Sequence, residues 1–199
     1  MTSAIILAAG ESKRMGVPKM LLQWGETTVL EHVISVFAKT GIKDILIITG
    51  AHKVEIEKVI SKSKTHDPVR SVFNENFSDG EMLSSIQCGI QELSDQAVGA
   101  AVIGLGDQPQ VQKETVRSIL NIHQSNENSI IVPSFEMKRG HPWLIPRRFW
   151  KDILDMKPPL TLRDFLALRA ALIHYVVINN PSILTDLDTP QDYENYRPR

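Results

Sequence analysis

The sequence has one cysteine, no long apolar run and almost no net charge, and each shortage excludes a class of protein. Cys88 is the single cysteine among 199 residues, so no disulfide can form within the chain. We therefore expect a reducing compartment, the cytoplasm. No stretch approaches the roughly 20 apolar residues that a membrane-spanning helix needs, and the apolar segment 4–9 is too short for a secretion signal. We expect no membrane partner.

The charges of the chain nearly cancel. It has 22 Lys and Arg residues against 23 Asp and Glu residues, a formal net charge of -1. Such a chain has no overall positive field that would attract nucleic acid or an anionic surface. We therefore expect no nucleic-acid partner, and any basic site must be local.

Several well-known site motifs are also missing. The six histidines are scattered and the one cysteine has no partner, which excludes a zinc site of the usual spacing. Ser84 and Ser85 lack the G-x-S-x-G surroundings of a hydrolase nucleophile. Gly10 has no glycine two residues later, as a dinucleotide fingerprint requires. Five residues separate it from Gly16 and no lysine follows, which excludes a P-loop.

The pattern that is present is an alternation of short apolar runs and amphipathic stretches, typical of one α/β domain spanning residues 1–199. We expect strands at residues 4–8, 44–49, 69–73, 100–105, 129–133 and 174–178, and helices at residues 29–39, 54–61, 82–93, 114–123 and after Thr189. Thr28 and Thr189 are expected to cap helices. This order predicts a mainly parallel sheet with helices on both faces.

One segment, residues 138–171, interrupts this alternation. It contains four prolines and two of the three tryptophans. We interpret it as an insertion with a binding role of its own.

The loop after the first strand has the composition of a phosphate site. Ala8, Ala9 and Gly10 are small enough for backbone N–H groups to approach a ligand closely. Three cations, Lys13, Arg14 and Lys19, follow within seven positions. Accessible backbone beside clustered cations is what a triphosphate requires.

Two carboxylates are candidates for a magnesium site. Asp107 follows the strand at 100–105, and Asp188 precedes the last helix. Magnesium favours one or two carboxylates together with phosphate oxygens. Asp107 could instead cap a helix. Asp186 is the alternative to Asp188, but the two point to opposite sides of an extended segment, so we choose Asp188.

Four motifs together resemble those of a known family. The string 7–19 matches every fixed position of L-A-A-G-x-S-x-R-M-G-x-P-K, the signature of the nucleotidyltransferases related to molybdenum cofactor cytidylyltransferase. G-D-Q-P at 106–109, G-H-P at 140–142 and D-L-D-T-P-Q-D at 186–192 are similar to its further motifs, in the same order and spacing. The resemblance therefore covers nearly the whole chain.

This resemblance implies a Rossmann-like three-layer α/β/α sandwich and the Mg²⁺-dependent transfer of a nucleoside monophosphate from an NTP to a phosphorylated acceptor, with release of pyrophosphate. It implies binding residues Leu7, Ala8, Ala9, Gly10, Lys19, Ser85, Gly106 and His141, catalytic residues Arg14, Lys19 and Asp107, and metal ligands Asp107 and Asp188.

Ala9 and Pro18 look like the cytidylyl branch of the family, which implies CTP and a molybdopterin-type acceptor. A molybdoenzyme or its maturation chaperone would then be a partner. We expect the segment 138–171 to bind the acceptor, through His141 and through nearby cations and aromatic rings: Arg139, Arg147, Arg148, Arg163, Trp143, Phe149 and Trp150. The alternatives are a guanylyl- or other nucleotidyltransferase with a different acceptor, and a carrier that delivers the finished cofactor.

Overall fold

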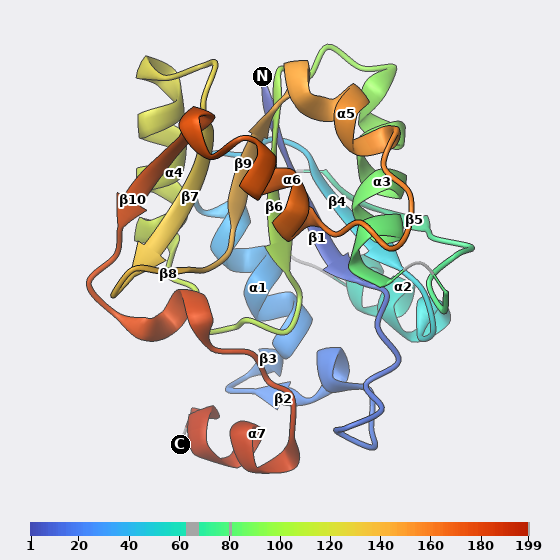
Figure 1. Cartoon of the computed structure of the whole chain (residues 1–199). Helices are drawn as coiled ribbons and strands as arrows, with labels where there is room; N and C mark the ends of the chain where they lie inside the picture. The colour runs from blue at the N-terminus through green and yellow to red at the C-terminus, as the bar shows by residue number, and fades with distance from the viewer. Residues whose placement is uncertain (63–67, 80, 199) are drawn as a thin grey trace.

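The computed structural model describes residues 1–62, 68–79 and 81–198 (Figure 1). Its main sheet follows the order β10-β7-β9-β6-β1-β4-β5, with β8 paired to β7. These strands are β1 (Thr2–Ala8), β4 (Ile45–Thr49), β5 (Val69–Phe73), β6 (Ala100–Leu105), β7 (Ile130–Phe135), β8 (Lys138–Arg139), β9 (Trp143–Pro146) and β10 (Ile173–Val177). A two-stranded ribbon pairs β2 (Gln23–Trp24) with β3 (Thr27–Thr28).

Helices cover both faces of this sheet. They are α1 (Val29–Ala38), α2 (Lys53–Ser61), α3 (Glu81–Ser94), α4 (Lys113–Ser125), α5 (Trp150–Leu154), α6 (Leu162–Leu168) and α7 (Pro190–Tyr196). Apolar residues of α1, α2 and α4 form one core cluster with alternate strand residues such as Ile6. Residues of α3, α5 and α6 form the other, with strand neighbours such as Ile5. The layers are therefore those of the expected α/β/α sandwich.

Neighbouring residues of β1 enter opposite clusters because side chains along a strand alternate between the two faces of the sheet. A strand buried on both faces is continuously apolar, as β1 and β4 are. Figure 1 shows the carboxyl ends of β1 and β6 at the lower edge of the sheet, above α7. Loops that follow these strands are thereby gathered at one edge, where ligands bind in such sheets.

The parallel pairings join β1 to β4 and β6, β4 to β5, and β7 to β10. β8 runs antiparallel to β7, and β9 runs antiparallel to both β6 and β7. It comes from the segment expected to be an insertion, yet it lies inside the sheet and its residues are buried. Part of the segment 138–171 is therefore built into the sheet, between β6 and β7.

The predicted helix caps are present. Thr28 and Thr189 each form a capping box, accepting a hydrogen bond from the backbone of the third helical residue, whose carboxylate accepts one in return. Helix α1 ends at Ala38, slightly earlier than expected, and Gly41 adopts a φ of +90° in the turn that follows. Within the described residues, no helix is long and apolar enough to cross a membrane.

Candidate active site

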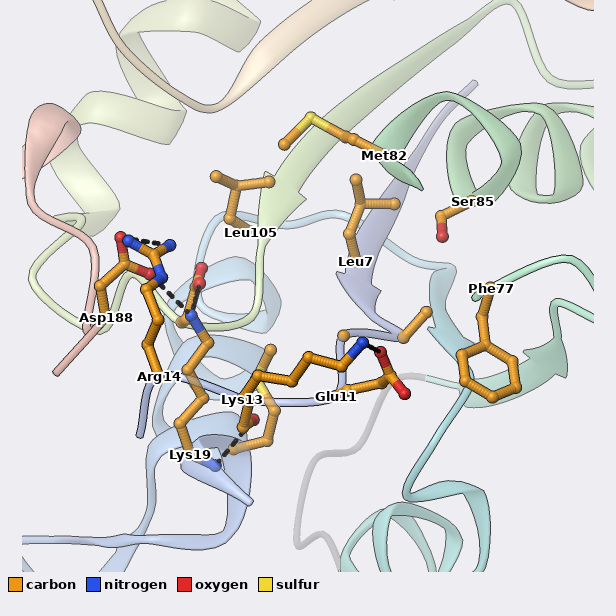
Figure 2. Close-up of a pocket in the computed structure, with 15 residues that line it drawn as sticks. Leu7, Glu11, Lys13, Arg14, Lys19, Phe77, Met82, Ser85, Leu105 and Asp188 are labelled. Carbon is orange, nitrogen blue, oxygen red and sulfur yellow. Dashed lines mark hydrogen bonds and ion pairs between the residues drawn. The ribbon is translucent and has the colours of Figure 1, made fainter. Parts of the chain in front are cut away.

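The loop after β1 folds back on itself and presents two cations. Ser12, at a φ of 55°, accepts hydrogen bonds at its carbonyl from the N–H groups of Met15 and Gly16, both at 3.0 Å. Its hydroxyl accepts the N–H of Lys19 at 3.2 Å. Met15 is buried in a small apolar cluster with Trp24, Val29 and Leu187. These contacts turn the chain so that the side chains of Arg14 and Lys19 both reach Asp188 (Figure 2).

Lys19 lies between two carboxylates from distant parts of the sequence. Its Nζ is 2.5 Å from Oδ2 of Asp107 and 3.2 Å from Oδ1 of Asp188. Arg14 reaches the other oxygen of Asp188 at 2.9 Å. Burial acts to lower the pKa of Lys19, but the charges and hydrogen bonds of the two carboxylates outweigh it, and the pKa is raised. Lys19 is therefore a permanent cation held by two anions.

A buried leucine holds Asp188 beside Asp107. The N–H of Leu187 donates to the carbonyl of Asp107 at 3.0 Å, and the Leu187 side chain is fully buried in the cluster that contains Met15. Asp186, on the other side of Leu187, accepts a hydrogen bond from Gln108 at 2.6 Å. Burial, followed by the charge of Asp107, raises the pKa of Asp186. The two aspartates thus face different partners, as their alternation predicts.

A pocket of about 360 Å³ opens over the carboxyl ends of β1 and β6. Figure 2 shows its two chemically different ends, with Asp188, Arg14 and Lys19 at one and Ser85 and Phe77 at the other. The lining residues are Leu7, Ala9, Gly10, Glu11, Ser12, Lys13, Arg14, Lys19, Met20, Phe77, Met82, Ser85, Leu105, Asp107 and Asp188. One end thus carries two aspartates and two cations, and the other carries apolar side chains and one hydroxyl. The ion pair of Lys13 and Glu11 lies between Arg14 and Phe77 in Figure 2.

Gly50, which follows β4, keeps the apolar end narrow. A Cβ at this position would lie 2.4 Å from the carbonyl oxygen of Ala9 and 2.8 Å from Cβ of Phe77. Any side chain at position 50 would therefore push the loop after β1 away from Phe77. The N–H of the next residue, Ala51, donates to the carbonyl of Ala9 at 3.2 Å and fixes the same contact.

The structure brings most of the expected site residues together. Eight of them line the pocket: Leu7, Ala9, Gly10, Arg14, Lys19, Ser85, Asp107 and Asp188. Ala8 and Gly106 are not among the residues that line the pocket. Ala8 is buried in the core, and the N–H of Gly106 donates to the carbonyl of Leu7 at 2.9 Å. Gly106 thus joins the ends of β1 and β6, where a Cβ would meet the sulfur of Met20 at 2.9 Å.

His141 lies outside the lining of this pocket. Its ring stacks on Trp143, with centroids 4.4 Å apart. Its backbone N–H donates to the carbonyl of Ile183 at 3.1 Å. Its Nε2 is buried and has no hydrogen-bond partner in the part of the chain that the structure describes. Burial, and then the charge of Arg163 on α6, lowers the pKa of His141 to about 4. The ring is therefore neutral at pH 7.

Arg147 and Arg148, two of the cations expected to surround an acceptor, lie at the other edge of the sheet. Because β9 is antiparallel to β6, Trp143 pairs with Ile103 near the carboxyl end of β6, while Pro146 pairs with Ala100 at its beginning. Arg147, just beyond β9, donates to backbone carbonyls at the end of α3 and in the following turn. The structure therefore does not bring this arginine to the edge where His141 lies.

The aromatic residues of this segment are part of the core. Trp143, Phe149 and Trp150 are buried on the face that α3 covers. The indole N–H groups of the two tryptophans donate to backbone carbonyls, Trp143 to Gly140 and Trp150 to Ile145. Arg148 also lies beyond β9, where it donates to Asn128 at 3.1 Å. An aromatic wall for the acceptor, as expected from sequence, is not formed by these three rings.

Sequence reasoning missed Phe77 and Met82, which form the apolar end of the pocket. They lie after β5 and in the first turn of α3, outside the four motifs that carry the family resemblance. Their position after a parallel strand was the available signal, since ligands bind beyond the carboxyl ends of strands.

The donor set suits one hard cation. Among the described residues, no group of three or more His, Cys, Asp and Glu side chains surrounds a common point. Asp107 and Asp188 do converge on one, which the ammonium of Lys19 occupies. Two carboxylates completed by phosphate oxygens are the usual magnesium environment, so these residues fit an ion that arrives with a triphosphate.

An α/β sandwich with a basic loop after its first strand and paired aspartates at its carboxyl edge defines a nucleotide-binding enzyme. The chain belongs to the family described as the MobA-like NTP transferase domain, which it matches over residues 4–174. It is a nucleotidyltransferase.

Individual relatives agree with this family. The molybdenum cofactor cytidylyltransferase of Escherichia coli (strain K12) is 26% identical over 190 residues, which are 95% of this chain and 92% of that protein. A nucleotidyl transferase from Methanothermobacter thermautotroptrophicus superimposes with a TM-score of 0.81 at 22% identity, over 99% of this chain and 96% of the other. Rv0371C from Mycobacterium tuberculosis H37Rv, in complex with manganese, superimposes with a TM-score of 0.74 at 22% identity, over 98% of this chain and 96% of the other.

Proposed function

We propose that this chain is a Mg²⁺-dependent cytidylyltransferase that moves CMP from CTP to the terminal phosphate of a molybdopterin-type cofactor and releases pyrophosphate. The observation that carries the proposal is the division of the pocket. Two carboxylates and two cations form one end, and Phe77, Met82 and the Ser85 hydroxyl form the other. A nucleoside triphosphate has the same division, with a flat base at one end and phosphates at the other.

The identity of base and acceptor is supported by similarity. The relative from Escherichia coli, which matches 95% of the chain, is named a molybdenum cofactor cytidylyltransferase. Ala9 and Pro18 also follow the pattern that resembles the cytidylyl branch.

In the proposed reaction, a phosphate oxygen of the acceptor attacks the α-phosphorus of CTP in line and forms a new P–O bond. The bond from the α-phosphorus to the bridging oxygen breaks, and pyrophosphate leaves with the electron pair. A phosphomonoester has its second pKa near 6 and is largely a dianion at neutral pH. It therefore needs no general base, and catalysis rests on position and charge neutralisation.

The residues of the charged end have separable roles. Asp107 and Asp188 would hold Mg²⁺, which supplies charge neutralisation for the phosphates when bound. Arg14 and Lys19 exchange their carboxylate partners for oxygens of the leaving pyrophosphate. Arg14 is the more accessible of the two, since its side chain is 72% exposed whereas that of Lys19 is 12% exposed. Lys19 is held between the two carboxylates until a ligand enters.

For the acceptor, we propose the side of the site formed by His141 and Arg163. Two features support this choice. The Nε2 atom of His141 has no partner in the described residues, and the charge of Arg163 acts on the same ring. The neutral imidazole suits a neutral pterin group, and the guanidinium suits a phosphate.

A screen of pyrophosphate release tests the proposal. CTP, UTP, ATP and GTP are each incubated with Mg²⁺ and the purified protein, with and without molybdopterin. We expect release that depends on the acceptor and a kcat/KM that is highest for CTP. A preference for GTP would exclude the cytidylyl assignment but retain the class. Tight binding of the finished dinucleotide without release from any NTP would indicate a carrier instead.

A further inference from the structure

Asn74 is a buried polar residue directly behind the apolar end of the pocket. It follows β5 and is only 3% exposed. Its N–H donates to the carbonyl of Thr49 at the end of β4 at 2.9 Å, which fixes its backbone. Its Oδ1 accepts the backbone N–H of Asn76 at 3.0 Å. An amide oxygen that accepts a backbone N–H identifies the other amide atom as the nitrogen, so the orientation of this side chain is determined.

The amide nitrogen donates to two neighbouring hydroxyl groups on α3. Nδ2 of Asn74 lies 2.9 Å from Oγ of Ser84 and 3.0 Å from Oγ of Ser85. Each hydroxyl therefore accepts from Asn74 and must direct its own proton elsewhere. Ser84 directs its proton to the carbonyl of Asn76, at 3.1 Å.

Ser85 differs from the other serines of its helix. Ser94, near the end of α3, donates to the carbonyl of Ile90 one turn earlier at 2.7 Å, the usual arrangement for a helical serine. Within residues 1–62, 68–79 and 81–198, the Ser85 hydroxyl forms no hydrogen bond other than the one it accepts from Asn74. Ser85 lines the pocket, and Figure 2 shows its hydroxyl directed toward the space beside Phe77. The proton of this hydroxyl is thus available to a ligand.

We infer that Asn74 is a positioning residue that fixes Ser85 as a hydrogen-bond donor to the nucleobase. Because its N–H occupies a lone pair of Oγ, Ser85 meets the ligand with its O–H. The apolar end then favours a base that presents an acceptor there, a carbonyl oxygen or ring nitrogen such as a pyrimidine offers. The inference rests on the proposed function, since it requires that the pocket bind a nucleotide.

Asn74→Asp tests this polarity directly. It keeps the shape and the acceptor for the N–H of Asn76, but it replaces the donating NH₂ by an oxygen that accepts the Ser85 proton. Binding of CTP and of inorganic tripolyphosphate is measured by calorimetry with Mg²⁺ and without acceptor. We expect the Kd of CTP to rise about tenfold, the scale of one lost hydrogen bond. The Kd of tripolyphosphate, which has no base, should stay the same.

A double-mutant cycle shows whether Asn74 acts through Ser85. Ser85→Ala alone should raise the Kd of CTP by a similar factor, and adding Asn74→Asp to it should have little further effect. Ser84→Ala removes the other hydroxyl that the same amide contacts, so it is the matched control and should leave the ratio of the two Kd values unchanged. Asn74→Ala introduces no buried charge and should show a smaller change in the same direction if Asn74→Asp does not fold.

Three results overturn the inference. One is a parallel loss of CTP and tripolyphosphate affinity in the Asn74 variants, which would mean that Asn74 only supports the fold. A second is full additivity of the Asn74 and Ser85 substitutions. The third is unchanged CTP binding in the Asn74 variants, with a CTP preference in the unaltered protein, which contradicts the inference alone. If the unaltered protein binds CTP no more tightly than tripolyphosphate, the proposed nucleotide site itself fails.

Discussion

At the scale of single residues, the position between Asp107 and Asp188 is already a cation site, occupied by the ammonium of Lys19. A metal ion and Lys19 cannot both lie at that point. Binding of Mg²⁺ with a triphosphate therefore requires the Lys19 side chain to turn toward the phosphates. The exchange keeps the local charges balanced, because the incoming phosphates supply new anions for Lys19.

Asp107→Asn should reduce nucleotidyl transfer by about 100-fold or more, the scale for one preorganised electrostatic group. The fold should persist, because Lys19 keeps Asp188 as a partner. Steady-state rates at saturating Mg²⁺ measure the effect. Asp186→Asn is the matched control, since Asp186 faces Gln108, and it should cost much less activity. Equal losses in the two variants would mean that Asp186 shares the metal site and that the choice of Asp188 over Asp186 is wrong.

His141 should make stability depend on pH below neutrality. In the unfolded chain a histidine takes up a proton as the pH falls through about 6.5, whereas folded His141 stays neutral down to a pKa of about 4. Its contribution is complete above pH 6.5 and is lost between pH 6.5 and 4, up to about 3 kcal/mol. Urea unfolding of the unaltered protein and of His141→Gln across this range measures it. Parallel curves for the two proteins would refute the depressed pKa.

At the scale of elements, the caps of α1 and α7 use the same chemistry in different surroundings. Thr28 and Thr189 both form capping boxes, and only Thr189 adjoins a proposed metal ligand. Either Thr→Ala change should lower the free energy of unfolding by about 1 kcal/mol. Thr189→Ala should in addition lower activity at limiting Mg²⁺, because Asp188 is then less well held.

Denaturant unfolding and a Mg²⁺ titration of the rate separate these effects. Thr28→Ala serves as the control for a lost cap without a neighbouring ligand. If both variants show the same Mg²⁺ dependence as the unaltered protein, the cap of α7 has no role in holding Asp188.

The elements that could be predicted are those whose apolar pattern is continuous or periodic. The strands β1, β4, β5 and β6 and the helix α1 fall within two residues of the expected bounds. β9 could not be predicted, since Trp143-Leu144-Ile145-Pro146 is short and lies between prolines, which indicates a loop. Its place in the sheet depends on partners in β6 and β7 that are distant in sequence.

At the scale of the whole molecule, the rule that ligands bind beyond the carboxyl ends of parallel strands correctly predicted that the loop after β1 and Asp107 lie at the same edge of the sheet. The rule did not predict how Asp188 reaches the same edge. That depends on burial of the Leu187 side chain and on the hydrogen bond from the backbone N–H of Leu187 to the carbonyl of Asp107. The acceptor residues were predicted least well. Arg147 and Trp150 follow His141 closely in sequence, but the antiparallel course of β9 carries them to the opposite edge.

In the proposed reaction a nucleotide binds in one direction, with its α-phosphorus near the acceptor and its β- and γ-phosphates beside Arg14 and Lys19. Labelled CTP tests this arrangement most directly. With Mg²⁺ and molybdopterin, label in the α-phosphate should pass to the acceptor, and label in the γ-phosphate should leave in pyrophosphate. Transfer of the γ-label to the acceptor, or binding of CTP without transfer of either label, would contradict nucleotidyl transfer to this acceptor.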